Sequence, residues 1–264
     1  MKLHIIGSSS DGNGYVFEAE DGALVVEAGV PLKAIKHALG WQIGKAKGCI
    51  ITHEHGDHAG RVKEYLADTT MPICASVGTA AALATKTSGL RQGRAMLPIE
   101  NGNVYHFGAF KVLPQRLVII DSDGGEHYTH DAAEPYCYQI HHPEMGAVLF
   151  ATDTYCLPCR FTGLTSVLIE CNYAQDILDK NTETGIVDPK RRDRTVTSHM
   201  SLENCIHELR SKTNLADLQR IILIHGSADN SNPDRFKAEV QAATGKPVVI
   251  AEAGMTIDLN RNPF

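Results

Sequence analysis

The segment Thr52-His53-Glu54-His55-Gly56-Asp57-His58-Ala59-Gly60 places several residues that can bind a metal ion within a few positions of one another. It directly follows Cys49-Ile50-Ile51, an apolar run that is typical of a buried strand. In extended backbone, side chains two positions apart point the same way. His53 and His55 can therefore hold one metal ion together.

The second half of this segment supplies ligands for a further position. Gly56 eases a turn, after which Asp57 and His58 face away from the first pair. Neutral imidazole and carboxylate groups are ligands that Zn²⁺, Mn²⁺ and Fe²⁺ favour. The alternative is a solvated turn that happens to contain three histidines, and the spacing after a buried strand disfavours it.

Three more polar residues stand at the ends of apolar strands. Asp153 comes shortly after Val148-Leu149-Phe150, His225 ends Ile221-Ile222-Leu223-Ile224, and His130 follows a further strand-like stretch. Each is a metal ligand or an unexplained polar group beside a core. Taken singly, each is typical of a satisfied polar residue, but with the first cluster they complete two sets of ligands.

The ordered set of these motifs resembles the metallo-β-lactamase fold superfamily of metallohydrolases. The resemblance covers nearly the whole chain, including the Gly- and Ser-rich loop at residues 7–13 and the strand at residues 24–29. It implies an α/β fold, a four-layer αββα sandwich with metal ions at one edge. We expect residues 1–264 to form a single domain of this kind.

The resemblance also implies a ligand set for two divalent metal ions per chain, Zn²⁺ in the first place and Mn²⁺ or Fe²⁺ as alternatives. One ion would be held by His53, His55 and His130, the second by Asp57, His58 and His225, and both would be bridged by Asp153 and a water. Glu27 stands where the family usually has Asp, and it would support the ligand loop from behind.

Within the superfamily, the chain is similar to the YycJ/WalJ-like phosphodiesterase and nuclease group, and more distantly to RNase Z. Residues 129–135, 168–173 and 198–204 carry this similarity. It implies that His199 lies near the scissile phosphate, where it binds substrate or protonates the leaving group. On position alone, a histidine at a helix start is an equal alternative. Ser201 and Asn13 are further substrate-binding candidates.

These features predict a dinuclear metal-dependent hydrolase, a phosphodiesterase that acts on nucleic acid or on a linear or cyclic nucleotide. The water between the metal ions would attack phosphorus in line, oriented by Asp57, and His199 would protonate the leaving oxygen. One alternative is a thioester, lactone or β-lactam hydrolase on the same metal ions. A sensor or scaffold without activity is the last alternative.

Composition limits the partners and the compartment. The 264 residues carry a net charge of −6, which argues against a surface coated in basic residues for long nucleic acid. Two basic clusters, Lys86/Arg91/Arg94 and Lys190-Arg191-Arg192/Arg194, could guide an anionic substrate or form a solvated face.

Seven scattered cysteines predict reduced thiols in the cytoplasm, and Cys156 and Cys159 are expected to be two packed thiols. No apolar run approaches the length of a membrane helix, and the start is too short in its apolar core for a secretory signal. A homodimer is a further expectation from the resemblance.

Apolar periodicity and turn signals predict the regular elements. Strands are expected at residues 2–6, 14–19, 23–27, 48–52, 72–75, 111–113, 136–141, 147–151, 166–170, 221–224 and 247–250, and helices at 31–39, 62–66, 78–87, 201–212 and 234–244. Ser201 is the expected N-cap of its helix. Most of the metal-ligating residues would then lie on loops at strand ends.

Overall fold

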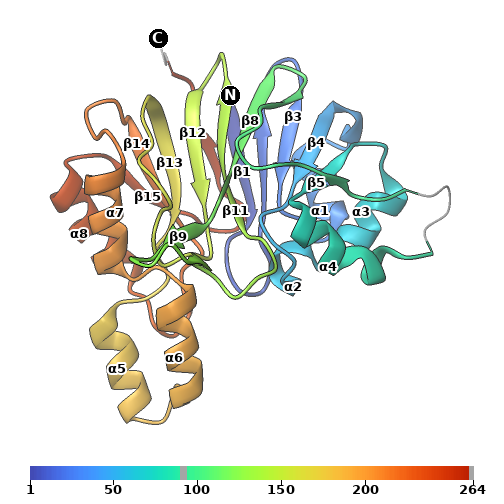
Figure 1. Cartoon of the computed structure of the whole chain (residues 1–264). Coiled ribbons are helices and arrows are strands. Elements are labelled where there is room, and N and C mark those ends of the chain that lie inside the picture. The colour runs from blue at the N-terminus through green and yellow to red at the C-terminus, as the bar shows by residue number, and fades with distance from the viewer. Residues whose placement is uncertain (90–93, 262–264) are drawn as a thin grey trace. The chain divides into compact units, whose positions relative to one another are not determined.

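The computed structural model describes residues 1–89 and 94–261 and divides into two compact units. The first unit contains Met1–Gln115, Ala132–Gly146 and the segment from Glu252 onward; the second contains Arg116–Asp131 and Ala147–Ala251. The fold is mixed α/β with two large sheets and helices, as predicted (Figure 1). The expectation of one domain over residues 1–264 stays a prediction.

A seven-stranded sheet lies wholly within the first unit. Its strands, in spatial order, are β16 (Thr256–Asp258), β1 (Lys2–Gly7), β2 (Gly14–Glu18), β3 (Ala23–Val26), β4 (Ala46–Ile50), β5 (Ile73–Ala75) and β6 (Leu97–Pro98). Neighbours from β16 to β3 are antiparallel, and those from β3 to β6 are parallel. The carboxyl ends of β3 and β4 therefore meet at one edge of this sheet, next to the histidine-rich segment.

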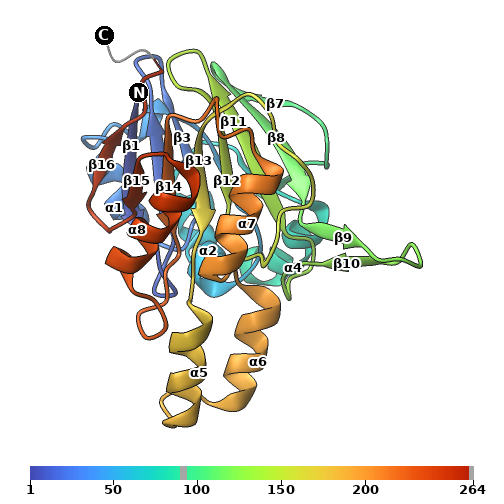
Figure 2. The same ribbon diagram turned by 90° about the vertical axis from the view of Figure 1, so that its left-hand side faces the viewer.

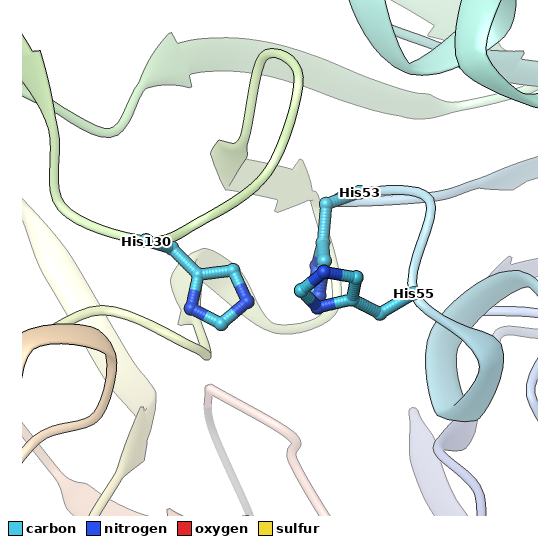
Figure 3. Close-up of side chains that lie close together, drawn as sticks. All are labelled: His53, His55 and His130. Carbon is cyan, nitrogen blue, oxygen red and sulfur yellow. The ribbon is translucent and has the colours of Figure 1, made fainter. Parts of the chain in front are cut away.

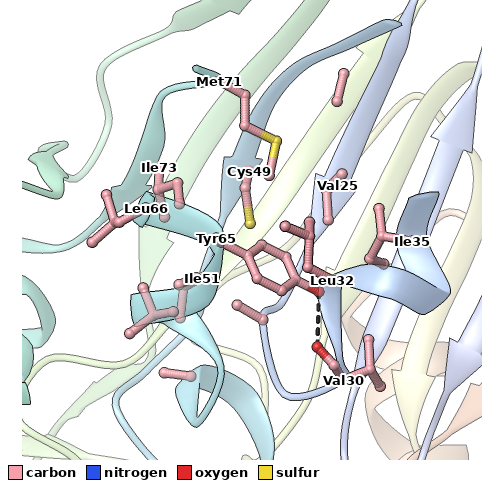
Figure 4. Close-up of a cluster of buried hydrophobic side chains, with 14 of the residues drawn as sticks. Val25, Val30, Leu32, Ile35, Cys49, Ile51, Tyr65, Leu66, Met71 and Ile73 are labelled. Carbon is pink, nitrogen blue, oxygen red and sulfur yellow. Dashed lines mark hydrogen bonds between the residues drawn. The ribbon is translucent and has the colours of Figure 1, made fainter. Parts of the chain in front are cut away.

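Helices α1 (Leu32–Ala38), α3 (Val62–Asp68) and α4 (Val77–Thr87) pack their apolar sides on this sheet. Figure 4 shows the resulting core, in which the Tyr65 ring lies among aliphatic side chains and Cys49. The Tyr65 hydroxyl donates a hydrogen bond of 3.0 Å to the Val30 carbonyl, which satisfies the polar end of a buried ring. This core holds β4 in place, the strand that directly precedes the histidine-rich segment.

The remaining regular elements of the first unit are η1 (Ile43–Lys45), the short helix α2 (Gly56–Ala59) and three strands: β7 (Tyr105–Phe107), β8 (Phe110–Arg116) and β11 (Tyr136–His142). β7 and β8 form an antiparallel hairpin. The Tyr138 hydroxyl on β11 donates to the Ile51 carbonyl at 2.6 Å. This bond ties β11 to the chain just before the histidine-rich segment.

A tight backbone contact fixes α2. The Asn13 amide donates to the Asp57 carbonyl at 2.7 Å, the Ala28 amide donates to the His58 carbonyl at 2.7 Å, and the Gly29 amide donates to the Asn13 carbonyl at 3.0 Å. A Cβ at Gly29 would lie 1.7 Å from the Asp57 carbonyl oxygen. Glycine is required here because the two backbones approach more closely than any side chain allows.

Parallel strands form the framework of the second unit: β12 (Gly146–Ala151), β13 (Leu164–Glu170), β14 (Arg220–Ile224) and β15 (Val248–Ile250). Helices α7 (Leu202–Lys212) and α8 (Pro233–Thr244) belong to the same unit. All seven residues of β13 are buried. Because parallel strands end at a common edge, Asp153 and His225, which follow β12 and β14, lie at the same edge as Glu170, the last residue of β13.

Two hairpins of the second unit were not expected from the sequence. The helices α5 (Gln175–Glu183) and α6 (Pro189–Ser198) run side by side and project from their unit's strands (Figures 1 and 2). The strands β9 (Val118–Ile120) and β10 (Glu126–Tyr128) form a two-stranded ribbon (Figure 2). Both carry few buried apolar residues, so periodicity gives little signal. Asp188 before Pro189 was an available helix-start signal.

Every strand and helix expected from the sequence has a counterpart whose bounds agree within a few residues. Ser201 is the N-cap of α7, as predicted, and its hydroxyl accepts a hydrogen bond from the Asn204 amide at 3.1 Å. Within residues 1–89 and 94–261, no helix combines the length and the apolar character that a membrane crossing needs.

Replacing Gly29 with Ala should destabilise the fold by about 1–3 kcal/mol or more, because the new methyl group overlaps the Asp57 carbonyl and one backbone must shift. Urea unfolding measures the loss. The matched control is Gly44→Ala, whose Cβ would meet nothing within 4 Å and should change stability by less than about 0.5 kcal/mol. Equal stability of the two variants would contradict the close contact.

Candidate metal centre

The first group of candidate ligands follows β4 in the first unit. His53 is buried, and its ring centroid lies 4.7 Å from that of His55 (Figure 3). The two rings pack edge to face, close to each other as the two-residue spacing predicts. The His58 ring, on α2, lies 4.2 Å from the His53 ring by centroid distance. Three imidazoles of the predicted ligand set are thus gathered at the end of one buried strand.

A buried carboxylate supports these rings from behind. Glu27 follows β3, is completely buried and has a positive φ of 70°, an uncommon conformation for a residue other than glycine. Its carboxylate accepts a 2.6 Å hydrogen bond from the Thr52 hydroxyl and lies 3.3 Å from Nδ1 of His58. Glu27 therefore lies against the ligand loop, and its predicted role in supporting the metal ligands stays a prediction.

The Thr52 hydroxyl connects Glu27 to His53. Because the hydroxyl hydrogen is donated to Glu27, its oxygen is left to accept from Nδ1 of His53, at 2.9 Å. Nδ1 of His53 then carries the proton and Nε2 carries the lone pair. This is the tautomer that can bind a metal ion through Nε2.

Asn13 and Asp57 lie on the other side of His58. The Asn13 side-chain amide is 3.1 Å from Nε2 of His58 and 3.4 Å from the Asp57 carboxylate, and Asp57 Oδ2 is 3.3 Å from the same Nε2. The Asn13 amide and the Asp57 carboxylate therefore both lie beside Nε2 of His58. Asn13 is completely buried, so the structure places it against the predicted ligands; its predicted contact with substrate stays a prediction.

In the second unit, Glu170 at the end of β13 organises the site. One carboxylate oxygen, Oε1, lies 2.7 Å from Nδ1 of His199 and 2.9 Å from Nδ1 of His225. The other, Oε2, accepts from the amides of Thr154 at 3.0 Å and Met200 at 3.2 Å. Glu170 is completely buried, and these four partners of its carboxylate are all N–H groups.

Neighbouring imidazoles keep the Glu170 carboxyl ionised, and in this form it only accepts hydrogen bonds. Burial acts to raise the pKa of its carboxyl, but His199 and the hydrogen bonds from His199 and His225 outweigh burial, so the pKa lies below its usual value. Burial acts to lower the pKa of His199, and the neighbouring Glu170 outweighs it, so that pKa lies above its usual value. A carboxylate only accepts, so both imidazoles donate from Nδ1 and direct Nε2 away from Glu170.

Asp153 and His130 complete the second unit's group. Nδ1 of His130 donates to the Ser198 carbonyl at 3.0 Å, which again leaves the lone pair on Nε2. Asp153 has a positive φ of 49°, and its carboxylate lies 3.4 Å from His199 and 3.7 Å from His225. Ligand atoms of Asp153, Glu170, His199 and His225 all lie within 4.8 Å of one another, as a metal site requires.

The structure also places the remaining predicted residues. The buried Ser201 hydroxyl caps α7, which accounts for this serine structurally; its substrate-binding role stays a prediction. His199 is not a helix-start residue, because it follows the last residue of α6 and contacts Glu170. Burial raises the pKa of the Cys156 thiol to about 11 and also raises that of Cys159, so both stay protonated.

The arginines of the second basic cluster form ion pairs at the surface, and the expectation that the cluster guides an anionic substrate stays a prediction. Each arginine in it already faces a carboxylate: Arg192 with Asp179 at 2.8 Å, Arg194 with Asp131 at 3.0 Å and Arg191 with Asp229 at 3.8 Å. In the first cluster, Arg94 donates to the Met71 carbonyl, and Arg91 lies outside the described residues.

Glu170 and Thr52 are the residues that sequence reasoning left without a role. A signal for Glu170 was present, since a carboxylate ends a strand whose other residues are mostly apolar, as Asp153 follows such a strand. Thr52 gave no signal of its own, because its contribution depends on the position of Glu27, far away in the sequence.

An α/β fold with two large sheets, whose strand ends carry histidine and aspartate clusters suited to metal ions, defines a class of metal-binding hydrolases. The chain belongs to the metallo-β-lactamase superfamily, whose family model matches residues 9–159.

Curated relatives have similar lengths and carry nuclease names. The chain is 26% identical over 250 residues to Exodeoxyribonuclease YycJ of Bacillus anthracis, covering 91% of this chain and 88% of that protein. It is 28% identical over 242 residues to Exodeoxyribonuclease WalJ of Streptococcus pneumoniae, covering 88% and 83%. The predicted similarity to the YycJ/WalJ-like group is confirmed.

Solved structures show the same fold at low identity. Zn²⁺-bound PqqB from Methylobacterium extorquens matches 98% of this chain and 100% of its own with a TM-score of 0.75 and 13% identity. The short form of human tRNase Z matches 98% and 99% with a TM-score of 0.63 and 14% identity. These likenesses confirm the metallo-β-lactamase fold.

Replacing Glu170 with Leu should destabilise the protein by about 3–5 kcal/mol, because it leaves the buried N–H groups of two imidazoles and two amides without their acceptor. Glu170→Gln keeps one accepting oxygen and should lose less. The matched control is Glu203→Gln, which lies on α7 outside this network. Urea unfolding compares the three, and a Leu variant as stable as the native chain would refute the network.

Proposed function

We propose that this hydrolase is a dinuclear metal-dependent phosphodiesterase that cleaves nucleic acid or a nucleotide phosphodiester. The observation that supports it most is the common orientation of the candidate ligand imidazoles. His53, His130 and His225 each donate from Nδ1 to a protein acceptor, and so each presents Nε2. Protein groups that orient histidines in this way are typical of metal sites.

The proposed ligands are those expected from the family pattern: His53, His55 and His130 for one ion, Asp57, His58 and His225 for the other, and Asp153 for both. Imidazole and carboxylate donors suit Zn²⁺, and Mn²⁺ or Fe²⁺ are alternatives. When bound, two such ions lower the pKa of water and stabilise the charge of an in-line displacement at phosphorus. The exonuclease names of YycJ and WalJ support a phosphodiester substrate.

Two residues of the chain would handle protons. The Asp57 side chain is 21% exposed, so its carboxylate can orient a water and accept its proton. The His199 side chain is 19% exposed, whereas those of His130 and His225 are nearly buried. With Nδ1 held by Glu170, Nε2 of His199 is the atom that would donate a proton to the leaving oxygen.

A substrate panel tests the proposal directly. The metal-loaded protein is assayed on single-stranded DNA, duplex DNA, RNA, a cyclic mononucleotide and a thioester under one set of metal conditions. We expect hydrolysis of at least one phosphodiester, with nucleic acid preferred because of the named relatives. Hydrolysis of the thioester alone would overturn the proposal. The cytoplasmic location and the homodimer stay predictions from the sequence.

Asp153→Ala should abolish phosphodiester hydrolysis while the fold survives, because it removes the carboxylate assigned to both ions. Metal analysis should show that fewer than two ions are retained per chain. The matched control is Asp229→Ala, an exposed carboxylate of the same unit, which should keep both metal and activity. Normal metal content and turnover in the Asp153 variant would contradict the ligand assignment.

His199→Ala tests the proton donor. Metal content should stay unchanged, and kcat on a DNA substrate should fall by about 10²–10⁴-fold, the usual range for general acid catalysis. The loss should shrink for a nitrophenyl phosphodiester, whose leaving group departs without a proton. If both substrates suffer alike and KM rises, His199 binds the phosphate instead. If only stability changes, its role is structural.

A further inference from the structure

A pocket of about 710 Å³ lies in the first unit, away from any residue of the candidate metal centre. It is bounded by α1, by β1 and by the segment that leads into β16. Its volume falls in the range of pockets that enclose small molecules. Much of the lining is apolar and comes from residues Ile5, Ile6, Pro31, Ala34, Ala38 and Met255.

Among the described residues that line this pocket, Lys33 carries a fixed positive charge. Lys33 and His37 are exposed and stand one helical turn apart on α1, so both side chains line the same face of the pocket. The other lining histidine, His4, is already held by Thr256 at 3.1 Å and Glu18 at 2.9 Å. Within the described part of the chain, no carboxylate lines the pocket. A ligand with a negative charge therefore fits better than a neutral or cationic one.

Trp41 provides an aromatic surface at the pocket. It is the sole tryptophan of the chain, and it is 60% exposed, although its indole is the largest apolar side chain available to the core. Its ring packs edge to face with His37, with centroids 6.3 Å apart. An exposed indole is a surface on which planar rings stack.

The backbone at Trp41 is also unusual. Its φ is +65°, directly after Gly40 at +58°, and its amide donates to the Lys36 carbonyl at 2.7 Å. In residues 1–89 and 94–261, only four residues other than glycine have a positive φ, and the other three, Glu27, Asp153 and His225, belong to the candidate metal centre. Such conformations are costly for bulky residues and concentrate at functional sites.

We propose that this pocket is a second binding site, for a small aromatic anion: a planar ring that carries a phosphate or a carboxylate. The ring lies against Trp41 and the apolar floor, and the anionic group lies between Lys33 and His37. Nucleoside monophosphates and aromatic carboxylates share this chemistry. The site does not depend on the proposed phosphodiesterase activity, because none of its residues belongs to the metal centre.

The single tryptophan makes the test direct, because all indole emission comes from the pocket. The full chain is titrated with phenyl phosphate, benzoate, AMP, adenosine and inorganic phosphate while Trp41 emission is recorded. Phenyl phosphate should give a saturable change with a Kd of about 1 mM or tighter, and inorganic phosphate should bind at least about tenfold more weakly. The AMP and benzoate arms show whether the pocket prefers a nucleotide or a carboxylate.

Charge variants on one helix separate a specific site from surface association. Lys33→Ala and His37→Ala should each weaken phenyl phosphate binding about tenfold, the usual loss when a hydrogen bond to a charged group is removed. Lys36→Ala is the matched control, since Lys36 lies on the same helix but outside the lining. It should bind as the native chain does.

Three results would overturn the proposal: no saturable change in emission up to about 10 mM ligand, equal weakening by Lys33→Ala and Lys36→Ala, or binding that Asp153→Ala abolishes. The last would place the ligand at the metal centre. Loss of phosphodiester hydrolysis in the substrate panel would leave this site intact, so the two proposals fail separately.

Discussion

Two buried carboxylates, Glu27 and Glu170, are the constraint on which the candidate centre depends. Each accepts hydrogen bonds from groups around the imidazoles, Glu170 directly from His199 and His225, and Glu27 through Thr52 to His53. A carboxylate in a low-dielectric interior is costly unless it is fully hydrogen-bonded. The hydrogen bonds that offset this cost also orient the imidazole rings. The candidate ligands are therefore oriented as soon as the chain folds.

The two units place their functional groups by the same device, which is a polar residue just beyond the end of a buried strand. Glu27 follows β3, and in the second unit Asp153 and His225 follow β12 and β14 with the backbone in the left-handed region. This conformation turns the chain sharply, so the side chain stays at the sheet edge instead of continuing with the strand. The surrounding core must hold such residues in place, because isolated chains avoid this conformation.

The features of the α5–α6 hairpin that the sequence analysis did not predict share one physical cause. The α5–α6 hairpin buries few apolar side chains, and its helices are held by polar contacts such as the Arg192–Asp179 pair. In the sequence, the cluster that contains Arg192 left two alternatives open, a solvated face or a guide for an anionic substrate. In the fold, each of its arginines has a carboxylate partner. Apolar periodicity indicates burial against a core, and it gives no information on which charged side chains form ion pairs in the fold.

The sequence by itself predicted nearly all the core strands from apolar periodicity, and it predicted the fold class from the resemblance of its ordered motifs to a known superfamily. It also named the candidate ligands, of which His53, His55, Asp57 and His58 form a local pattern. Only the tertiary structure decided which acceptor each imidazole faces. Thr52 stands next to His53 in the chain, but Glu27, which orients its hydroxyl, arrives from another strand. Likewise, Glu170 meets His199 and His225 only after β13 and β14 pair. Hydrogen-bond direction depends on distances between segments, and a linear pattern does not encode those distances.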